Sequence, residues 1–286
     1  MFGISKHKIK MREIKNWLLV MLLVFAFSSH TYGQRFGTSK VYKVDPWLDG
    51  GITLIAGVGN FSGLNIVKNK ARYTEEEIMG WGPEDVNWFD RPATRIDPAI
   101  AENGQNLSDL GANIGNALPL LLGLDSEIRK DWMDILLLYI QAGFANGAIY
   151  SWPSGVTIDR ARPLIYNPRE PLERKTGGHM RTSWYSGHVS TTATGTFFAA
   201  KVYIDYHPEI GNKKYLLYAG AATIPIFVGV NRYRAGKHFP SDIIVGLIVG
   251  SAMGIIMPEL HKRDRKKVAI MPLGGDVNGL GMSFRF

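Results

Sequence analysis

The 286-residue chain contains no cysteine, which excludes both a disulfide framework and a thiol nucleophile. It also lacks the glycine-rich motifs of Walker phosphate loops and of dinucleotide-binding folds. We find neither zinc-ligand spacing nor the basic-aromatic repeat typical of nucleic-acid binding, and no internal repeat or low-complexity segment. The sequence therefore gives no reason to expect a metal, a cofactor or a nucleic-acid partner.

The first 33 residues have the layout of a bacterial secretory signal peptide. Five cations lie within residues 1–15, an apolar run extends from Trp17 to Phe27, and small residues stand at positions 31 and 33. An uncleaved membrane anchor is the alternative, although the apolar run is short for a span. Removing residues 1–33 lowers the formal net charge from +8 to +4, because five cations and Glu13 leave with them. We expect a mildly basic, periplasmic protein of the bacterial cell envelope.

Beyond that segment, six windows carry no formal charge and are rich in Leu, Ile, Val, Ala and Gly. They show little strand-like alternation, so we predict five or six helices in an all-α bundle. A mature chain of about 250 residues fits a single domain, which we place at residues 34–267. The windows are residues 50–67, 111–124, 135–158, 182–200, 215–231 and 243–258.

The C-terminal residues 268–286 have a different character. Residues 268–271 and 280–286 flank a Gly- and Asn-containing turn region, and the second segment alternates apolar residues with a period of two. We predict a short β-hairpin that packs against the bundle, because one hairpin cannot close a barrel.

The segment from Arg232 to Asp242 combines cations, a histidine and a carboxylate. Pro240 suits the first turn of a helix, which the following apolar run supplies, so His238 lies at the mouth of that helix. Asp242 can reach back to one imidazole nitrogen and leave the other available as a nucleophile. Guanidinium groups and helix amides at such a mouth bind phosphate. An isolated His–Asp pair would more often be a helix cap.

Two further motifs precede this segment. In Ser186-Gly187-His188, the serine can donate a hydrogen bond, the glycine lets the backbone approach an anion, and the histidine can protonate a leaving oxygen. Arg162 stands before Pro163 in a predicted loop. Each motif alone is a weak signal, but the three in this order indicate a phosphate-handling site.

Together these residues resemble the type 2 phosphatidic acid phosphatase (PAP2) superfamily, which includes lipid phosphatases, bacterial nonspecific acid phosphatases and vanadium haloperoxidases. Its pattern is a Lys seven residues before the Arg of an Arg-Pro pair, then Pro-Ser-Gly-His, then Ser-Arg followed by His and Asp. The resemblance covers residues 134–260 and implies that His238 is a nucleophile forming a phosphohistidine, that Asp242 orients it and that His188 is the general acid. It also implies a helical bundle with a phosphate-binding set of Arg162, Arg232, Ser186 and the Gly187 amide.

Three positions depart from that pattern. Gly155 stands where the family has its phosphate-binding Lys, Tyr185 replaces a Pro, and Asn231 replaces a Ser. Losing a cation that contacts the phosphoryl group costs on the order of 10²-fold in rate if nothing replaces it. We consider four nearby cations as replacements, and we include the first of them in the predicted phosphate-binding set: Arg160, Arg181, Arg234 and Lys237.

The sequence thus predicts a metal-independent phosphatase acting on a phosphomonoester or diphosphate. The favoured substrate is a lipid such as phosphatidic acid, an isoprenoid diphosphate or a lipid A phosphate, and soluble phosphomonoesters are the alternative. Gly155 motivates a second hypothesis, a degenerate member of the family that binds a lipid phosphate without turnover. A vanadate-dependent haloperoxidase, with vanadate on His238, is a third.

An insert at residues 68–109 is expected to return to the end of the bundle that carries the motifs. Its aromatic residues Trp81, Trp88 and Phe89 either line the pocket or pack the insert onto the bundle, and we favour packing. Several apolar windows are shorter than the roughly 20 residues that a bilayer requires. We therefore favour a periplasmic globular bundle with membrane association over a bundle that spans the inner membrane.

Overall fold

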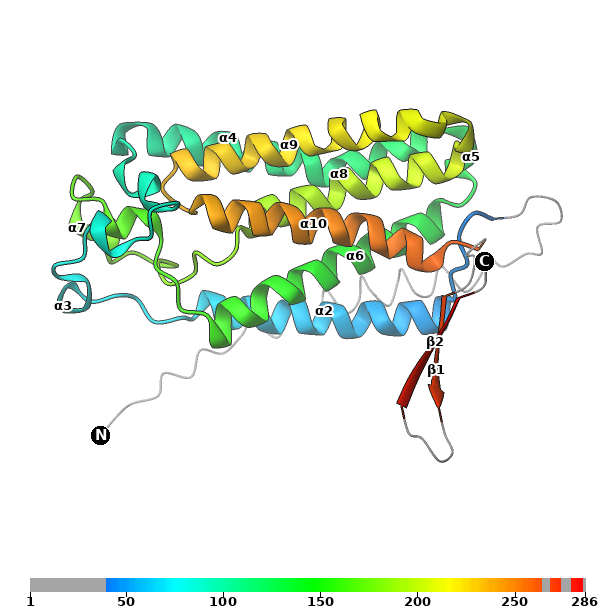
Figure 1. The fold of residues 1–286 in the computed structure, drawn as a ribbon, viewed down its shortest axis with the longest axis horizontal. Coiled ribbons are helices and arrows are strands. Elements are labelled where there is room, and N and C mark those ends of the chain that lie inside the picture. The colour runs from blue at the N-terminus through cyan, green and yellow to red at the C-terminus, as the bar shows by residue number, and fades with distance from the viewer. Residues whose placement is uncertain (1–39, 264–267, 274–278, 285–286) are drawn as a thin grey trace, which may run out of the picture.

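A computed structural model describes residues 40–263, 268–273 and 279–284 of the chain. In these ranges, six helices of 17 to 23 residues form an elongated bundle (Figure 1) and confirm the predicted all-α class. They are α2 (Pro46–Lys68), α4 (Ala101–Ala117), α6 (Trp132–Trp152), α8 (Gly187–Tyr206), α9 (Lys214–Arg234) and α10 (Pro240–His261). The predicted signal segment lies outside the described residues.

Short helical turns connect the long helices. Between α2 and α4 lie α3 (Glu75–Ile78), η1 (Pro83–Asp85), η2 (Arg91–Arg95) and η3 (Pro98–Ile100); η4 (Leu118–Leu124) and α5 (Ser126–Arg129) lead into α6. Between α6 and α8 lie η5 (Pro153–Thr157), η6 (Pro163–Tyr166) and α7 (Leu172–Lys175), and η7 (Pro208–Lys213) precedes α9. The α3 and α7 turns lie at the same end of the bundle as the start of α10 (Figure 1).

The helix boundaries follow local signals where those signals exist. The side chain of Asp45 accepts hydrogen bonds from the backbone N–H groups of Trp47 and Leu48 and so caps α2. Pro240 opens α10 as predicted. The windows were poorer guides for α4, which begins at Ala101 and not near residue 111, because a criterion based on missing charge excludes a charged first turn. The same criterion placed the start of α8 five residues too early, because the loop residues 182–186 before it carry no formal charge.

Close packing of α8 on α10 fixes the position of the predicted motifs. A Cβ atom at Gly250 would lie 2.1 Å from the carbonyl oxygen of Ser190, and one at Gly246 would lie 2.7 Å from that of Ser186. Only glycine permits this approach. The backbone N–H of Ser186 then donates to the carbonyl of Asp242 at 3.1 Å. The second and third motifs therefore meet at one end of the bundle.

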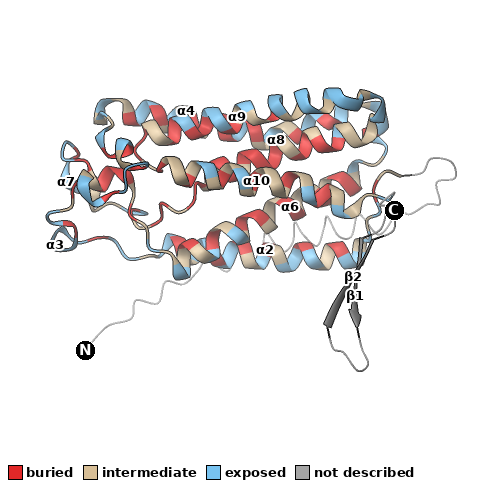
Figure 2. Cartoon of the chain, in the orientation of Figure 1, coloured by how far each residue is buried: buried red, intermediate tan, exposed pale blue. Residues whose placement is uncertain are grey.

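The outer faces of α2 and α10 are apolar and exposed (Figure 2). Both helices are long and apolar enough to cross a membrane, yet only 28% of each apolar window is buried inside the bundle. A core helix of a soluble protein would be mostly buried, so this exposure favours membrane association. Large exposed side chains on these faces include Trp47, Ile52, Ile55, Val58 and Phe61 of α2 and Ile244, Ile248, Ile256 and Leu260 of α10.

The strands β1 (Val268–Leu273) and β2 (Gly279–Phe284) pair antiparallel, with Val268 opposite Phe284 and Leu273 opposite Gly279. They pair only with each other among the described residues, and Figure 1 shows them projecting from the bundle. The expectation of a hairpin packed against the bundle is therefore not supported. The fold class rests on the helices alone.

Candidate active site

His238 lies on the loop between α9 and α10 and is almost fully buried. Its ring Nδ1 is 2.7 Å from the backbone carbonyl oxygen of Ser183. Because a carbonyl oxygen only accepts hydrogen bonds, this contact places the proton on Nδ1 and leaves the lone pair on Nε2. Burial, followed by the charges of Arg232 and Arg162, lowers the pKa of His238 well below its ordinary value. The ring is therefore neutral at pH 7, as a nucleophile must be.

Asp242 holds the loop of His238 and does not bond directly to the ring. Its Oδ2 is 3.9 Å from Nδ1 of His238, which is beyond hydrogen-bond distance. The same oxygen accepts from the hydroxyl of Ser183 at 2.6 Å and from the backbone N–H of Phe239 at 2.9 Å. Ser183 thus links the carboxylate to the ring, and the direct Asp–His bond expected from the four-residue spacing is corrected to a contact through this serine.

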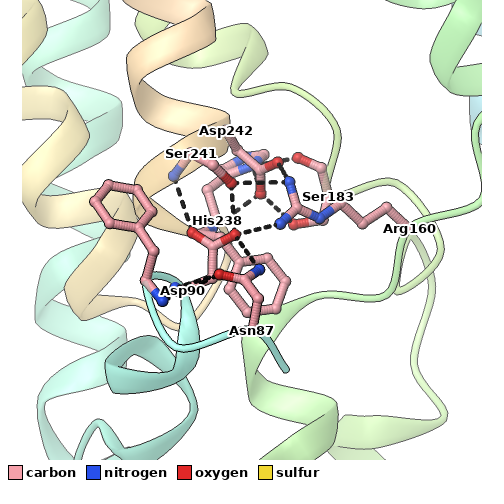
Figure 3. Close-up of polar contacts among 9 residues, drawn as sticks. Asn87, Asp90, Arg160, Ser183, His238, Ser241 and Asp242 are labelled. Atoms are coloured by element: carbon pink, nitrogen blue, oxygen red, sulfur yellow. Dashed lines mark hydrogen bonds and ion pairs between the residues drawn. The ribbon is translucent and has the colours of Figure 1, made fainter. Parts of the chain in front are cut away.

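Arg160 extends this network to the insert (Figure 3). Its Nη1 contacts Asp242 and lies 3.0 Å from the hydroxyl of Ser241, while its Nη2 donates to Asp90 at 2.7 Å. Asp90 also accepts from the backbone N–H and the hydroxyl of Ser241, at 3.1 and 2.7 Å, and from Asn87 at 3.0 Å. Burial opposes ionisation of Asp90, but these hydrogen bonds and the charge of Arg160 outweigh it and lower the pKa of Asp90.

The expected role of Arg160 in phosphate binding therefore needs correction. Both terminal nitrogens of its guanidinium contact carboxylates, and the group lies over the ring of Phe239 at 4.6 Å from the centroid. Arg160 positions Asp242 and is already neutralised by Asp90. The sequence could not show this, because Asp90 precedes Arg160 by 70 residues and belongs to the insert.

Arg162, Arg232 and Ser186 bring unpartnered polar atoms to the same region. The Nε atoms of both arginines and Oγ of Ser186 are buried and have no hydrogen-bond partner among the described residues. Arg232 uses its Nη1 to donate to Gln105 of α4 at 3.1 Å. Both guanidinium charges act on His238, so they lie near the nucleophile. Buried polar groups nearly always have partners, and this set of orphaned groups therefore indicates a ligand rich in oxygen atoms.

His188 lies in the first turn of α8 on the open side of the site, with its side chain 41% exposed. Its Nε2 is 3.1 Å from Oδ1 of Asp109 in α4, and the same oxygen is 3.8 Å from Nη1 of Arg232. The carboxylate orients the imidazole toward the cationic groups. Asp109 was not predicted, because nothing in its local sequence points to a partner in α8.

Two glycines of the expected motifs have packing roles. A Cβ atom at Gly187 would lie 3.1–3.2 Å from the ring of Tyr150, so this glycine lets the tyrosine cover the start of α8. A Cβ atom at Gly155 would lie 3.0 Å from Ile66 and 3.4 Å from Val67. Position 155 therefore faces the end of α2, where a lysine side chain would collide with the apolar residues of that helix.

The structure places all eight predicted site residues at one end of the bundle, but it pairs Arg160 with two carboxylates. It adds four polar residues that the sequence did not reveal: Asp90, Asp109, Ser183 and Ser241. Of these, only Ser241 had a local signal, since it stands between Pro240 and Asp242. Within the part of the chain that the structure describes, no group of three or more His, Asp and Glu side chains is placed to hold a metal ion.

A family model for the PAP2 superfamily matches residues 131–266, which contain all three motifs. Phosphatidylglycerophosphatase B of Bacillus subtilis is 26% identical over 178 residues, or 59% of this chain and 81% of the relative. A crystal structure described as the first transmembrane PAP2 type phosphatidylglycerolphosphate phosphatase from Bacillus subtilis matches with 17% identity and a TM-score of 0.41, covering 87% of this chain and 98% of that one. The family match spans the Arg160 loop, the start of α8 and the His238 loop.

Proposed function

We propose that this chain, a phosphoric ester hydrolase of the PAP2 superfamily, removes phosphate from a lipid. In this proposal the reaction proceeds through a phosphohistidine on His238. The observation that carries this proposal is a neutral, buried histidine beside two arginines and a serine. The Nε atoms of the two arginines and the hydroxyl of the serine have no hydrogen-bond partner among the described residues. Such a set can hold the oxygens of a phosphoryl group while an imidazole attacks its phosphorus.

The first chemical step uses Nε2 of His238. The Nδ1 proton is held by the carbonyl of Ser183, so the lone pair on Nε2 can form a bond to phosphorus while the bond to the leaving oxygen breaks. Arg162, Arg232 and Ser186 bind the equatorial oxygens, on which negative charge is concentrated. His188, on the open side of the site, donates a proton to the departing oxygen.

The second step releases phosphate. A water molecule on the open side attacks the phosphorus of the phosphohistidine, and His188, now deprotonated, accepts a proton from that water. The bond between phosphorus and Nε2 breaks, and its electron pair returns to the imidazole. The loop held by Asp242, Arg160 and Asp90 keeps the ring in place through both steps.

A lipid substrate is supported by the exposed apolar faces and by the similarity to a phosphatidylglycerophosphatase. In this proposal the bundle lies in a membrane of the bacterial cell envelope, with its motif-bearing end at the water interface. We place that end on the periplasmic side. This placement requires α2 to begin at the cytoplasmic face, so in this proposal residues 1–33 do not export the start of α2, in contrast to the signal peptide expected from the sequence. A lipid phosphate could then reach His238 from the plane of the membrane.

The test is release of inorganic phosphate by the full chain in detergent micelles. Phosphatidic acid, phosphatidylglycerophosphate, an isoprenoid diphosphate and p-nitrophenyl phosphate are compared, each with and without EDTA. We expect turnover of lipid substrates that survives EDTA and is abolished in His238→Ala. Absence of turnover on all four substrates by a folded protein would overturn the proposal in favour of a binding protein, and full activity of His238→Ala would overturn the mechanism.

A further inference from the structure

A second group of basic residues lies next to Arg162 and outside the set that surrounds His238. The backbone N–H of Arg162 donates to the carbonyl of Met180 at 3.0 Å, so His179, the residue before Met180, lies close to the Arg162 loop. Two residues after Arg162, the N–H of Leu164 donates to the carbonyl of Gly236 at 3.2 Å, which brings Lys237 to the other side. The backbone therefore places His179 and Lys237 on the two flanks of Arg162.

The start of the insert adds two more cations to this group. Lys70 donates to the carbonyls of Ser154 and Ile158, at 2.9 and 2.7 Å, and so anchors the segment after α2 to the loop before Arg162. Tyr73 packs with Met180 in a buried cluster. This arrangement carries Lys68 and Arg72 toward His179. Burial, followed by the charges of Arg162, Lys237, Lys68 and Arg72, lowers the pKa of His179, so its ring is neutral at pH 7 and can serve as a hydrogen-bond donor.

The carboxylates in this region are already matched to other cations. Glu170 is 3.0 Å from Nη1 of Arg174, while Glu77 and Asp159 both pair with Arg181, the latter at 3.0 Å. No ion pair is recorded for Arg162, Lys237, His179, Lys68 or Arg72 among the described residues. The local positive charge is therefore left without a protein counter-ion.

The backbone on both flanks adopts unusual conformations. His179 has φ 66°, the only positive value of a non-glycine residue in the described part of the chain. Gly236, directly before Lys237, has φ 63°. A left-handed conformation is strained for a non-glycine residue, and such strain concentrates at binding and catalytic sites. His179 is also exposed, so a ligand can reach it from solvent.

We propose that Lys237 and His179, on the two sides of Arg162, form a second anion subsite at the mouth of the pocket that binds a second phosphate group of the substrate. This inference rests on the proposed phosphatase function and narrows its substrate class. The preferred substrates carry two phosphate groups, one that His238 attacks and one that remains on the leaving group. The family has a phosphate-binding Lys where this chain has Gly155. A cation at the mouth of the pocket replaces that missing charge, but at a different position.

The test compares kcat/KM for lipids with one and with two phosphates, in micelles of a neutral detergent. Phosphatidic acid supplies one phosphate, an isoprenoid diphosphate supplies two that are adjacent, and phosphatidylglycerophosphate supplies two separated by glycerol. We expect the wild type to prefer a two-phosphate lipid and Lys237→Met to lower that preference about 10- to 100-fold, because a charge-assisted contact to one phosphate is lost. The preferred two-phosphate lipid identifies the spacing that the subsite accepts.

Two variants and one control complete the design. Lys237→Arg should keep the preference, since it keeps the charge. His179→Gly should lower it, since glycine keeps the left-handed backbone but removes the imidazole N–H that can donate to a phosphate oxygen. Lys175→Met removes a lysine at the same end of the bundle and should leave the preference unchanged. Inhibition by inorganic pyrophosphate and by phosphate offers a second readout, in which wild type favours pyrophosphate and Lys237→Met does not.

The pH dependence provides an independent check. Burial, followed by the charges of Arg162, Arg232 and Arg174 and partly offset by Glu170, lowers the pKa of Lys237 to about 8. Lys237 is charged below that pH and neutral above it, so the preference for two phosphates should decline as pH rises through 8. Lys237→Arg should remove this decline.

If Lys237→Met lowers kcat/KM equally for one- and two-phosphate lipids, the second subsite is overturned. The proposed phosphatase function would still stand. A wild type that turns over phosphatidic acid but prefers neither two-phosphate lipid would do the same. By contrast, a wild type with no turnover on any lipid would contradict the proposed function itself.

Discussion

The two ends of the bundle differ in how completely their buried charged side chains are paired. At the end away from the site, Lys201 contacts Asp205 and lies 2.8 Å from Glu259, while Asp205 is also 2.6 Å from Lys262 and accepts from the hydroxyl of Tyr42 at 2.9 Å. Every charged group in this cluster has a partner of opposite charge or a hydrogen bond. Such saturation is what folding alone requires of buried ions.

At the motif end, buried groups are left incomplete. The Nε atoms of Arg162 and Arg232 and the hydroxyl of Ser186 have no partner in the described part of the chain. The same helices, α8 and α10, contribute to both ends, so the difference is not one of fold. Buried cations without a carboxylate partner at the motif end are therefore groups whose missing oxygens a ligand can supply.

The motif end is itself divided into a saturated and an unsaturated part. Arg160 is neutralised by Asp90 and Asp242, and Arg181 is neutralised by Glu77 and Asp159. Arg162 stands between these two arginines in sequence, yet no carboxylate of the described residues forms an ion pair with it. Arginines within one short loop region thus serve different purposes, and only their partners distinguish them.

The largest effect is expected when an unpaired cation is removed. Arg162→Met should lower kcat/KM by about 10²- to 10³-fold, because a group that stabilises the transferring phosphoryl oxygens is lost. Its melting temperature without ligand should stay the same or rise, since a buried charge without a partner is replaced by an apolar side chain. Steady-state kinetics and thermal unfolding in detergent measure both.

The control for Arg162→Met is Arg181→Met, which removes a paired arginine nearby. Arg181→Met should lower the melting temperature and leave kcat/KM nearly unchanged, which is the reverse of the result expected for Arg162→Met. If Arg162→Met lowers the melting temperature more than Arg181→Met does, Arg162 has a structural partner. The distinction between an unpaired Arg162 and a paired Arg181 would then be wrong.

The far end should show the opposite sensitivity. Asp205→Asn removes the carboxylate shared by Lys201, Lys262 and Tyr42, and breaking a buried ion pair in this way costs about 3 kcal/mol. We therefore expect a clearly lower melting temperature, with kcat of the folded protein within about 2-fold of wild type, which is the usual scatter for a site remote from the chemistry. A large loss of kcat at a temperature where the variant is folded would show that the two ends are coupled.

A smaller effect is expected at Asp90, which acts on His238 only through Arg160, Ser241 and Asp242. Asp90→Asn keeps the shape but removes the charge that faces Arg160, so Asp242 must neutralise the guanidinium alone. We expect kcat to fall about 10-fold with little change in KM, as for a positioning residue whose loss misplaces a catalytic group.

Two further measurements separate positioning by Asp90 from simple structural support. Asp90→Glu should recover part of the lost kcat, because it restores the charge. A variant with a lower melting temperature but unchanged kcat would show that Asp90 has only a structural role. The insert would then make no contribution to catalysis through Asp90.

Much of the fold and the ligand-facing part of the site could be predicted from the sequence. Charge-free apolar windows located all six long helices, and Pro240 marked the start of α10. The residues with a recognisable motif, such as Ser186, His188 and His238, meet because α9 runs back between α8 and α10, so that these two helices begin at the same end of the bundle. Local patterns carry this information, since helices and their first turns are set by neighbouring residues.

The supporting residues could not be predicted, for a physical reason. Asp90 meets Ser241 across 151 residues of sequence, and Asp109 meets His188 through the packing of α4 on α8. Such contacts depend on tertiary packing, which leaves no local pattern. Arg160 was misassigned for the same reason, because its carboxylate partners lie on other elements. Gly155 looked like a lost cation, whereas the structure shows a position filled by α2.

The central claim is that His238 carries the phosphoryl group during turnover. The most direct measurement is to mix the full-length protein with a lipid labelled in its terminal phosphate, quench at alkaline pH, where phosphohistidine is retained, and locate the label by peptide mass spectrometry. The account predicts a phosphate mass shift on His238 that appears during turnover and is absent from His238→Ala. Turnover without any label on His238, or label that persists elsewhere in His238→Ala, would contradict it.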